Sequence, residues 1–172
     1  AMRGRRPYRL SGLKSDRGFG VGNWKNHHMS LAVKRSESHE EAEAVRILRT
    51  RVFVEEQGVA PELEMDGLDD TAVHVVAYKS GVVIGTGRLI LDTPDNARIG
   101  RMAVEASLRR SGVGSAVLAF LENEARAQGI KQVSLHAQNY VKDFYAKCGY
   151  LEYGDTFLEA GILHIEMKKD IV

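Results

Sequence analysis

From residue 30 onward, the spacing of hydrophobic residues alternates between a strand-like and a helix-like period. Runs rich in β-branched residues predict strands over residues 31–35, 72–78, 82–91, 97–104, 133–137, 151–153 and 162–168. Apolar residues spaced three and four apart predict helices over residues 39–54, 113–128 and 139–148. Strands interleaved with helices in this way predict an α/β fold built on one mixed β-sheet.

Short local motifs mark the ends of several of these elements. Ser38 and Glu41 form a capping-box pattern at the start of the first helix. Gly129 and Gly149 stand at positions where a left-handed residue closes a helix. The link at residues 79–81 is short enough to predict an antiparallel hairpin between the strands on either side.

The first 29 residues differ from the rest in composition and charge. They contain five glycines and carry a net charge of +6, whereas residues 30–172 carry a net charge of −5. They hold no hydrophobic segment of the length that an export signal requires. We expect residues 1–29 to be a basic, glycine-rich arm or extension, with an organelle-targeting segment or a nucleic-acid-contacting tail as alternatives. We expect residues 30–172 to form a single domain.

Overall composition narrows the class of protein. Hydrophobic residues make up 44% of the chain and charged residues 27%, which is ordinary for a globular domain. No apolar run approaches the roughly 20 residues that cross a bilayer. The chain has 1 cysteine, which fits a reducing compartment and provides no cysteine-based metal cage. We therefore expect a cytoplasmic protein with no metal cofactor and with neither a membrane nor a nucleic acid as the partner of its acidic domain.

A glycine-rich turn links the strand that ends near Val104 to the long helix that follows. Its residues are Arg109, Arg110, Ser111, Gly112, Val113 and Gly114, with Ser115 next in the chain. A helix N-terminus attracts anions through its unpaired N–H groups, and glycine lets an anion approach the backbone closely. The turn lacks the Gly-Lys-Ser/Thr of a Walker loop and the three glycines of a dinucleotide fingerprint. The turn therefore predicts a pyrophosphate site that is neither a Walker loop nor a dinucleotide-binding fingerprint.

A second group of residues follows the strand at 133–137, in the run NYVKDFYAKCGY. With this run and the turn RRSGVG, the chain resembles the GCN5-related N-acetyltransferases (GNAT family), whose cofactor motif is Arg/Gln-x-x-Gly-x-Gly/Ala. The segments RTRVFVEEQGV, ELEMDGLDD, IGRMAV, LHAQ and FLEAGILHIEM resemble the small ElaA/YjcF-like branch of that family. The resemblance covers nearly all of residues 30 to 170.

The resemblance implies a sheet of six or seven strands, splayed between the fourth and the fifth and flanked by about four helices. It also implies acetyl-CoA as the co-substrate, lying where the two strands part. Its pyrophosphate would rest on the backbone of residues 109–115, and its pantetheine arm and thioester carbonyl on backbone groups of Met102, Ala103 and Val104. Asn139 and Phe144 would also contact the cofactor, and Tyr145 would protonate or hydrogen-bond the departing sulfur.

The reaction implied by the resemblance is acetyl transfer to a primary amine of a small molecule or peptide, by direct attack in a ternary complex. An amine with a pKa of about 10.4 is protonated at neutral pH, so some group must accept its proton. Glu56, after the first helix, and His136, on the strand at 133–137, are the candidate bases, and a water chain is the alternative. His74 and His164 fit structural roles better.

Several alternatives stay open. Tyr145 shares its helical spacing with Val141, Phe144 and Cys148, so it could be an interior aromatic residue instead. The seven acidic residues between Glu55 and Asp70 form either a negative rim that attracts cationic amines or a solvated loop.

Two other functions remain as alternatives to the N-acetyltransferase. One is a non-catalytic, CoA-binding sensor. The other is an acyl-homoserine-lactone synthase, a family with a similar Arg-x-x-Val-Phe and Glu-x-Asp-x-x-Asp series. A homodimer is the expectation at the level of the family.

Overall fold

The computed structural model describes residues 30–172, and the expected arm at residues 1–29 lies outside this range. The strands are β1 (Ala32–Arg35), β2 (Val73–Lys79), β3 (Val82–Leu91), β4 (Asn96–Val104), β5 (Gln132–Gln138), β6 (Leu151–Glu159) and β7 (Ile162–Asp170). The α-helices are α1 (His39–Arg49), α2 (Pro61–Glu64), α3 (Val113–Ala127) and α4 (Lys142–Lys147). Shorter helical segments are η1 (Thr50–Glu56), η2 (Asp69–Thr71), η3 (Ala106–Leu108) and η4 (Asn139–Val141).

The seven strands form one sheet in the order β1-β2-β3-β4-β5-β7-β6. All neighbours are antiparallel except β4 and β5, which are parallel. The β4–β5 pairing runs only from Asn96↔Gln132 to Ile99↔Leu135, although β4 continues to Val104 and β5 to Gln138. The sheet is therefore splayed between its fourth and fifth strands, and the predicted α/β fold is confirmed.

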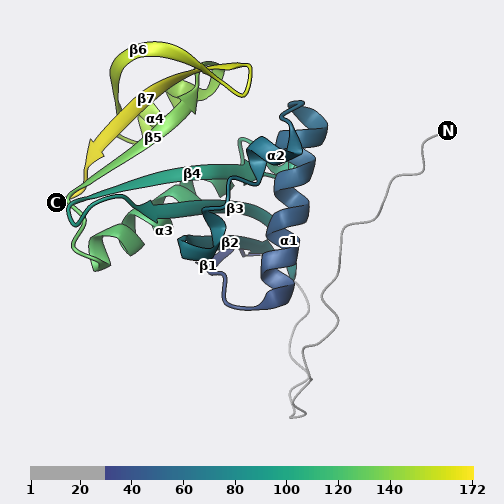
Figure 1. Cartoon of the computed structure of the whole chain (residues 1–172). Coiled ribbons are helices and arrows are strands. Elements are labelled where there is room, and N and C mark those ends of the chain that lie inside the picture. The colour runs from purple at the N-terminus through teal and green to yellow at the C-terminus, as the bar shows by residue number, and fades with distance from the viewer. Residues whose placement is uncertain (1–29) are drawn as a thin grey trace.

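Helices cover both faces of the sheet (Figure 1). Leu48 of α1 and Val52 of η1 pack on Ala103 of β4. The larger core lies on the other face, where α3 and α4 pack against the sheet. The helix α3 lies close over β3 because Gly87 has no side chain: a Cβ there would stand 2.6 Å from Leu121 Cδ1.

Local motifs form as predicted at the ends of several elements. The capping box at Ser38 and Glu41 is present at the start of α1. Ser80 and Gly81 link β2 to β3 as a two-residue turn, and both have positive φ, as a type I′ hairpin turn requires. Gly129 and Gly149 are left-handed, with φ of +79° and +92°.

Three predicted elements differ from the structure. The helix expected over residues 39–54 changes after Arg49 into a π-helix that runs to Glu56, a change that the apolar spacing does not signal. The helix expected over residues 139–148 opens with the 3₁₀ turn η4. The strand expected over residues 151–153 extends to Glu159. The sequence did not indicate this extension, because β6 is almost wholly exposed and its hydrophobic and polar residues do not alternate. No helix in residues 30–172 is both long and apolar enough to cross a bilayer.

Candidate functional site

The glycine-rich turn stands at the N-terminus of α3, as predicted. Gly112 is the N-cap residue with a φ of +88°, and within residues 30–172 no side chain caps the helix. The first N–H groups of α3 therefore have no capping partner there, and a Cβ at Gly112 would meet nothing within 4 Å. Arg109, Arg110 and Ser111 are exposed beside it. These donors suit a diphosphate.

Gly114 has a different role from Gly112. A Cβ at Gly114 would stand 3.3 Å from Cζ of Phe144, so this glycine lets the Phe144 ring lie against the first turn of α3. Phe144 packs at the edge of the main core and contacts Tyr145 edge-on, with 4.9 Å between the ring centroids. The predicted cofactor residues on α3 and α4 are therefore in direct contact.

In the described part of the chain, β4 has no strand neighbour beyond Ile99 on the side that faces β5, so N–H groups on that edge are available to a ligand. A bulge lies just there: Arg88 pairs with Gly100 and Thr86 with Ala103, and Arg101 has a φ of +53°. The structure thus places the predicted backbone donors at residues 102–104 beside the splay. Asn139 begins η4 directly after β5.

Arg109 connects the turn to two other segments. Its Nε donates to the Val104 carbonyl at 3.1 Å, and its Nη2 donates to Glu56 Oε2 at 2.7 Å. The carboxylate of Glu56, one of the two candidate bases, is therefore engaged by a guanidinium of the turn. Arg51 and Glu105 make a second ion pair between η1 and the end of β4, at 2.5 Å. The π-helical segment is held against the turn.

The Tyr145 side chain is buried between two aromatic rings. It lies 4.9 Å from Phe144 and 6.0 Å from Tyr150, measured between ring centroids. Burial raises the pKa of the Tyr145 phenol, so the group keeps its proton. Within residues 30–172 its hydroxyl makes no hydrogen bond. This environment combines core packing with a hydroxyl that has a proton to donate.

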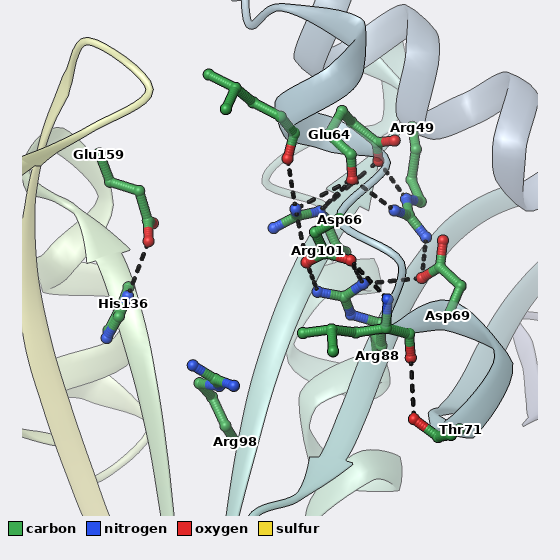
Figure 2. Close-up of polar contacts among 12 residues, drawn as sticks. Arg49, Glu64, Asp66, Asp69, Thr71, Arg88, Arg98, Arg101, His136 and Glu159 are labelled. Carbon is green, nitrogen blue, oxygen red and sulfur yellow. Dashed lines mark hydrogen bonds and ion pairs between the residues drawn. The ribbon is translucent and has the colours of Figure 1, made fainter.

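His136 lies where the two strands have parted. It follows Leu135, the last residue of β5 that pairs with β4, and it faces away from the buried residues Val133, Leu135 and Ala137. Its Nδ1 lies 3.2 Å from Glu159 Oε1, and Figure 2 shows this pair apart from the charged cluster on β3 and β4. Of the two candidate bases, His136 is the one on a strand of the splay.

The two other histidines weighed as bases have structural contacts. The Nε2 atom of His74 lies 3.0 Å from the Asp69 carbonyl. His164 is buried, and its Nδ1 lies 2.7 Å from the Ile162 carbonyl. Both rings are therefore held by backbone carbonyls.

The acidic run between Glu55 and Asp70 is compensated only in part, because Glu55, Glu62 and Asp70 lie exposed at the surface. Three of its acids, Glu64, Asp66 and Asp69, pair with arginines from α1, β3 and β4 (Figure 2). The pairs are Arg49 with Glu64 and Asp69, Arg88 with Asp66 and Asp69, and Arg101 with Asp66. The compensating cations come from distant parts of the chain, and whether the exposed acids attract an amine or are only solvated stays a prediction.

This ion-pair network binds the loop after α2 to the sheet. Arg88 contacts Asp66 at 2.7 Å and Asp69 at 2.8 Å, and its hydrogen bond lowers the pKa of Asp66. Burial opposes ionisation of Asp69, but hydrogen bonds from Arg49 and Arg88 outweigh it and lower the pKa of Asp69. Arg101 also donates to the carbonyls of Leu63 and Glu64. The network fixes the loop in place.

A hydrogen-bonded bridge that the sequence did not suggest joins the loop after η1 to the end of β5. Gln138 Nε2 donates to Gln57 Oε1 at 2.8 Å, and Gln57 Nε2 donates to the Tyr140 hydroxyl at 3.2 Å. The bridge connects the segment after η1 to the end of β5. Gln57 and Gln138 lie 81 positions apart in the chain, so no local motif could have revealed it.

A small polar groove of about 160 Å³ lies on the face of the sheet that carries His136. It is lined by Asn96, Gln132, Ser134, Glu166 and Lys168. Glu166 is the cross-strand neighbour of His136 on β7. No cluster of three or more metal-ligating side chains occurs in the described part of the chain.

Known proteins share this sequence pattern and this architecture. The profile of the family described as "Acetyltransferase (GNAT) domain" matches residues 33–171. The uncharacterized N-acetyltransferase YjcF of Bacillus subtilis is 36% identical over 124 residues, which are 72% of this chain and 88% of YjcF.

Two solved structures have the same fold. Escherichia coli ElaA superposes with a TM-score of 0.73 at 27% identity, covering 82% of this chain and 100% of that one. An aminoglycoside 6′-N-acetyltransferase complexed with coenzyme A superposes with a TM-score of 0.67 at 16% identity, covering 82% of this chain and 97% of that one. At that identity the likeness shows the fold alone.

Proposed function

The chain belongs to the GNAT family of acetyltransferases, and from this we propose that it transfers the acetyl group of acetyl-CoA to a primary amine of a small molecule or peptide. The observation that carries the proposal is the coincidence of two features. The β4–β5 pairing ends at Ile99↔Leu135, and the uncapped N-terminus of α3 follows β4 in the chain. An extended arm ending in a diphosphate fits these features together.

The cofactor would be bound mainly by backbone groups. The N–H groups of residues 112–115 and the side chains of Arg109 and Arg110 would hold the diphosphate. The free edge of β4 at Met102, Ala103 and Val104 would pair with the pantetheine arm and polarise the thioester carbonyl. Asn139 and Phe144 would contact the arm from the β5 side. Bound there, acetyl-CoA supplies an activated acyl group.

The chemical step needs one proton acceptor and one proton donor. The amine nitrogen attacks the thioester carbonyl carbon, the C–N bond forms, and the C–S bond breaks as the tetrahedral intermediate collapses. His136 would accept the proton that the nitrogen loses, and Tyr145 would give its proton to the departing sulfur. Cys148 is half-buried at the end of α4 and packs at the edge of the core. Direct attack in a ternary complex therefore suits these residues better than an acyl-enzyme.

The motif series shared with acyl-homoserine-lactone synthases has a structural explanation. Arg49 of the first motif pairs with Glu64 and Asp69 of the second. These side chains belong to the ion-pair network that holds the loop after α2, so their presence does not require that reaction.

Release of free thiol from acetyl-CoA tests the proposal. The protein is mixed with acetyl-CoA and a panel of polyamines, aminoglycosides and lysine peptides, and CoA–SH is followed with a thiol reagent. We expect amine-dependent release with at least one class of acceptor. Tight binding of acetyl-CoA without release from any amine would instead support the sensor.

The proposal extends to the organisation of the chain. Residues 30–172 would act as one catalytic domain, and residues 1–29 would be an arm outside it. We expect the protein to be a homodimer in the cytoplasm. Removal of residues 1–29 should therefore leave thiol release unchanged, and light scattering should give the mass of two chains.

A further inference from the structure

Glu159 is placed beside the splay by a tight hairpin turn. It is the last residue of β6 and pairs with Ile162, so only Ala160 and Gly161 separate it from β7. Their φ angles of +49° and +76° are those of a type I′ turn, whose twist matches that of the flanking strands. The turn keeps the hairpin short and sets the position of the Glu159 carboxylate.

The Glu159 carboxylate lies between two imidazole rings. Its Oε1 is 3.2 Å from His136 Nδ1, and its Oε2 is 3.7 Å from His164 Nε2. Phe157 meets the His136 ring edge-on, with 4.9 Å between centroids, and stacks on His164. His164 is itself fixed, because its Nδ1 donates to the Ile162 carbonyl. The His136 ring is thus held by the Glu159 carboxylate at Nδ1 and by edge-on contact with the Phe157 ring.

This contact determines which nitrogen of His136 carries the hydrogen. A carboxylate has only acceptors, so the hydrogen of the Nδ1–Oε1 contact belongs to Nδ1. The neutral ring then has its lone pair on Nε2, and within residues 30–172 Nε2 has no hydrogen-bond partner. The Glu159 side chain is half-exposed and the His136 side chain one-third exposed, so the pair can be reached from solvent.

We propose that Glu159 is a positioning residue for acetyl transfer, one that holds His136 as the Nδ1–H tautomer and stabilises the imidazolium formed when Nε2 accepts the proton of the amine. The inference rests on the proposed function. The proton moves from the attacking nitrogen to Nε2 as the C–N bond forms, and it leaves to solvent after the product departs. Glu159 itself stays ionised throughout.

The electrostatic environment is consistent with this role. The hydrogen bond from His136 lowers the pKa of Glu159, and the charge of Arg101 acts in the same direction against burial. The carboxylate is therefore charged at neutral pH, as stabilisation of an imidazolium requires. Glu166, the cross-strand neighbour of His136, pairs with Lys168 at 3.5 Å.

Three variants separate positioning from structure. Glu159→Ala removes both the charge and the acceptor, Glu159→Gln keeps an acceptor oxygen without the charge, and Glu152→Ala is the matched control. Glu152 lies on the same strand, but it pairs with Lys142 at 2.6 Å and sits opposite the buried Met167. Two readouts are used: kcat and KM for acetyl transfer, and the ¹⁵N chemical shifts of His136 in the neutral ring without ligands. The His136 signals are assigned by comparison with His136→Gln.

We expect Glu159→Ala to lower kcat by about tenfold to a hundredfold with KM for acetyl-CoA unchanged. Glu159→Gln should lie between Glu159→Ala and the wild type, and Glu152→Ala should match the wild type. The ¹⁵N shifts should show the Nδ1–H form of His136 in the wild type and more of the Nε2–H form in Glu159→Ala.

An unchanged tautomer in Glu159→Ala, or a kcat within twofold of that of Glu152→Ala, would overturn the inference. A wild-type protein that transfers acetyl to no amine would instead overturn the proposed function. In that event the ¹⁵N shifts still decide whether Glu159 sets the tautomer of His136.

Discussion

Arg109 of the glycine-rich turn is ion-paired with Glu56 at the end of the π-helical segment, with 2.7 Å between Nη2 and Oε2. The pair joins a residue expected to bind the diphosphate to a residue considered as the general base. Both side chains are at least one-third exposed, so the pair contributes little to stability. The pair favours His136 over Glu56 as the proposed base, and it predicts that Glu56 competes with the diphosphate for Arg109.

The first prediction concerns Glu56→Gln. The substitution frees the charge of Arg109, so we expect the Kd for CoA to fall by up to about fivefold, the range of an exposed ion pair. The kcat for acetyl transfer should stay close to that of the wild type. Calorimetric titration with CoA and steady-state kinetics measure the two effects, and the exposed neighbour Glu55→Gln is the control. A kcat loss near 100-fold would return Glu56 to the role of base.

The second prediction concerns the contact between Gly114 and Phe144. A Cβ at Gly114 would stand 3.3 Å from the Phe144 ring. In Gly114→Ala, crowding of that ring should cost about 1 to 3 kcal/mol of stability, offset by up to about 1 kcal/mol from the higher helix propensity of alanine. Urea unfolding measures the cost. The double variant with Phe144→Leu should recover part of it. Equal losses of stability in the single and double variants would show that contact with the Phe144 ring is not the cause of the loss.

The third prediction distinguishes the effect of side-chain size at Gly114 on cofactor binding from the effect of negative charge. Gly114→Asp adds a negative charge in the first turn of α3, close to the expected diphosphate, so binding of acetyl-CoA should be lost while unfolding remains cooperative. Gly114→Asn, of nearly the same size without the charge, should retain weakened binding. Unchanged affinity in Gly114→Asp would remove the diphosphate from this turn.

The fourth prediction concerns Tyr145→Phe. If the phenol protonates the departing sulfur, kcat should fall by about 100-fold while the Kd for CoA is kept. The stability should not change, because within residues 30–172 the hydroxyl has no hydrogen-bond partner. Steady-state kinetics and urea unfolding provide the two measurements. An unaltered kcat would make Tyr145 a core residue only.

Elements specified by neighbouring residues were predictable from the sequence, and contacts between distant segments were not. The capping box at Ser38 and the turn at residues 80–81 depend on local backbone chemistry, and both form as expected. The arginines that compensate Asp66 lie 22 and 35 positions away, so the acidic run looked uncompensated. Glu159 was overlooked because β6 is exposed and shows no alternation, and only the β5–β7–β6 register brings it to His136.

The fifth prediction concerns pH and the capping box of α1. Burial opposes ionisation of Glu41, but hydrogen bonds from Lys34, the backbone of Glu37 and the Tyr78 hydroxyl outweigh it and lower the pKa of Glu41 to about 2. A carboxyl whose pKa is lower in the folded than in the unfolded state stabilises the fold above the unfolded value and loses that contribution as the pH falls toward the folded value. The loss should therefore occur between pH 4.5 and pH 2.

Glu41→Gln is the matched test of that loss, because glutamine also completes a capping box but has no charge to titrate. We expect the variant to be less stable than the wild type at pH 7 by about 2 kcal/mol, and the difference to shrink as the pH is lowered to 3. Urea unfolding at pH 7, 4 and 3 measures both curves, with the exposed Glu43→Gln as the control. A difference that stays constant with pH would mean that Glu41 acts through packing of its side chain instead of through its charge.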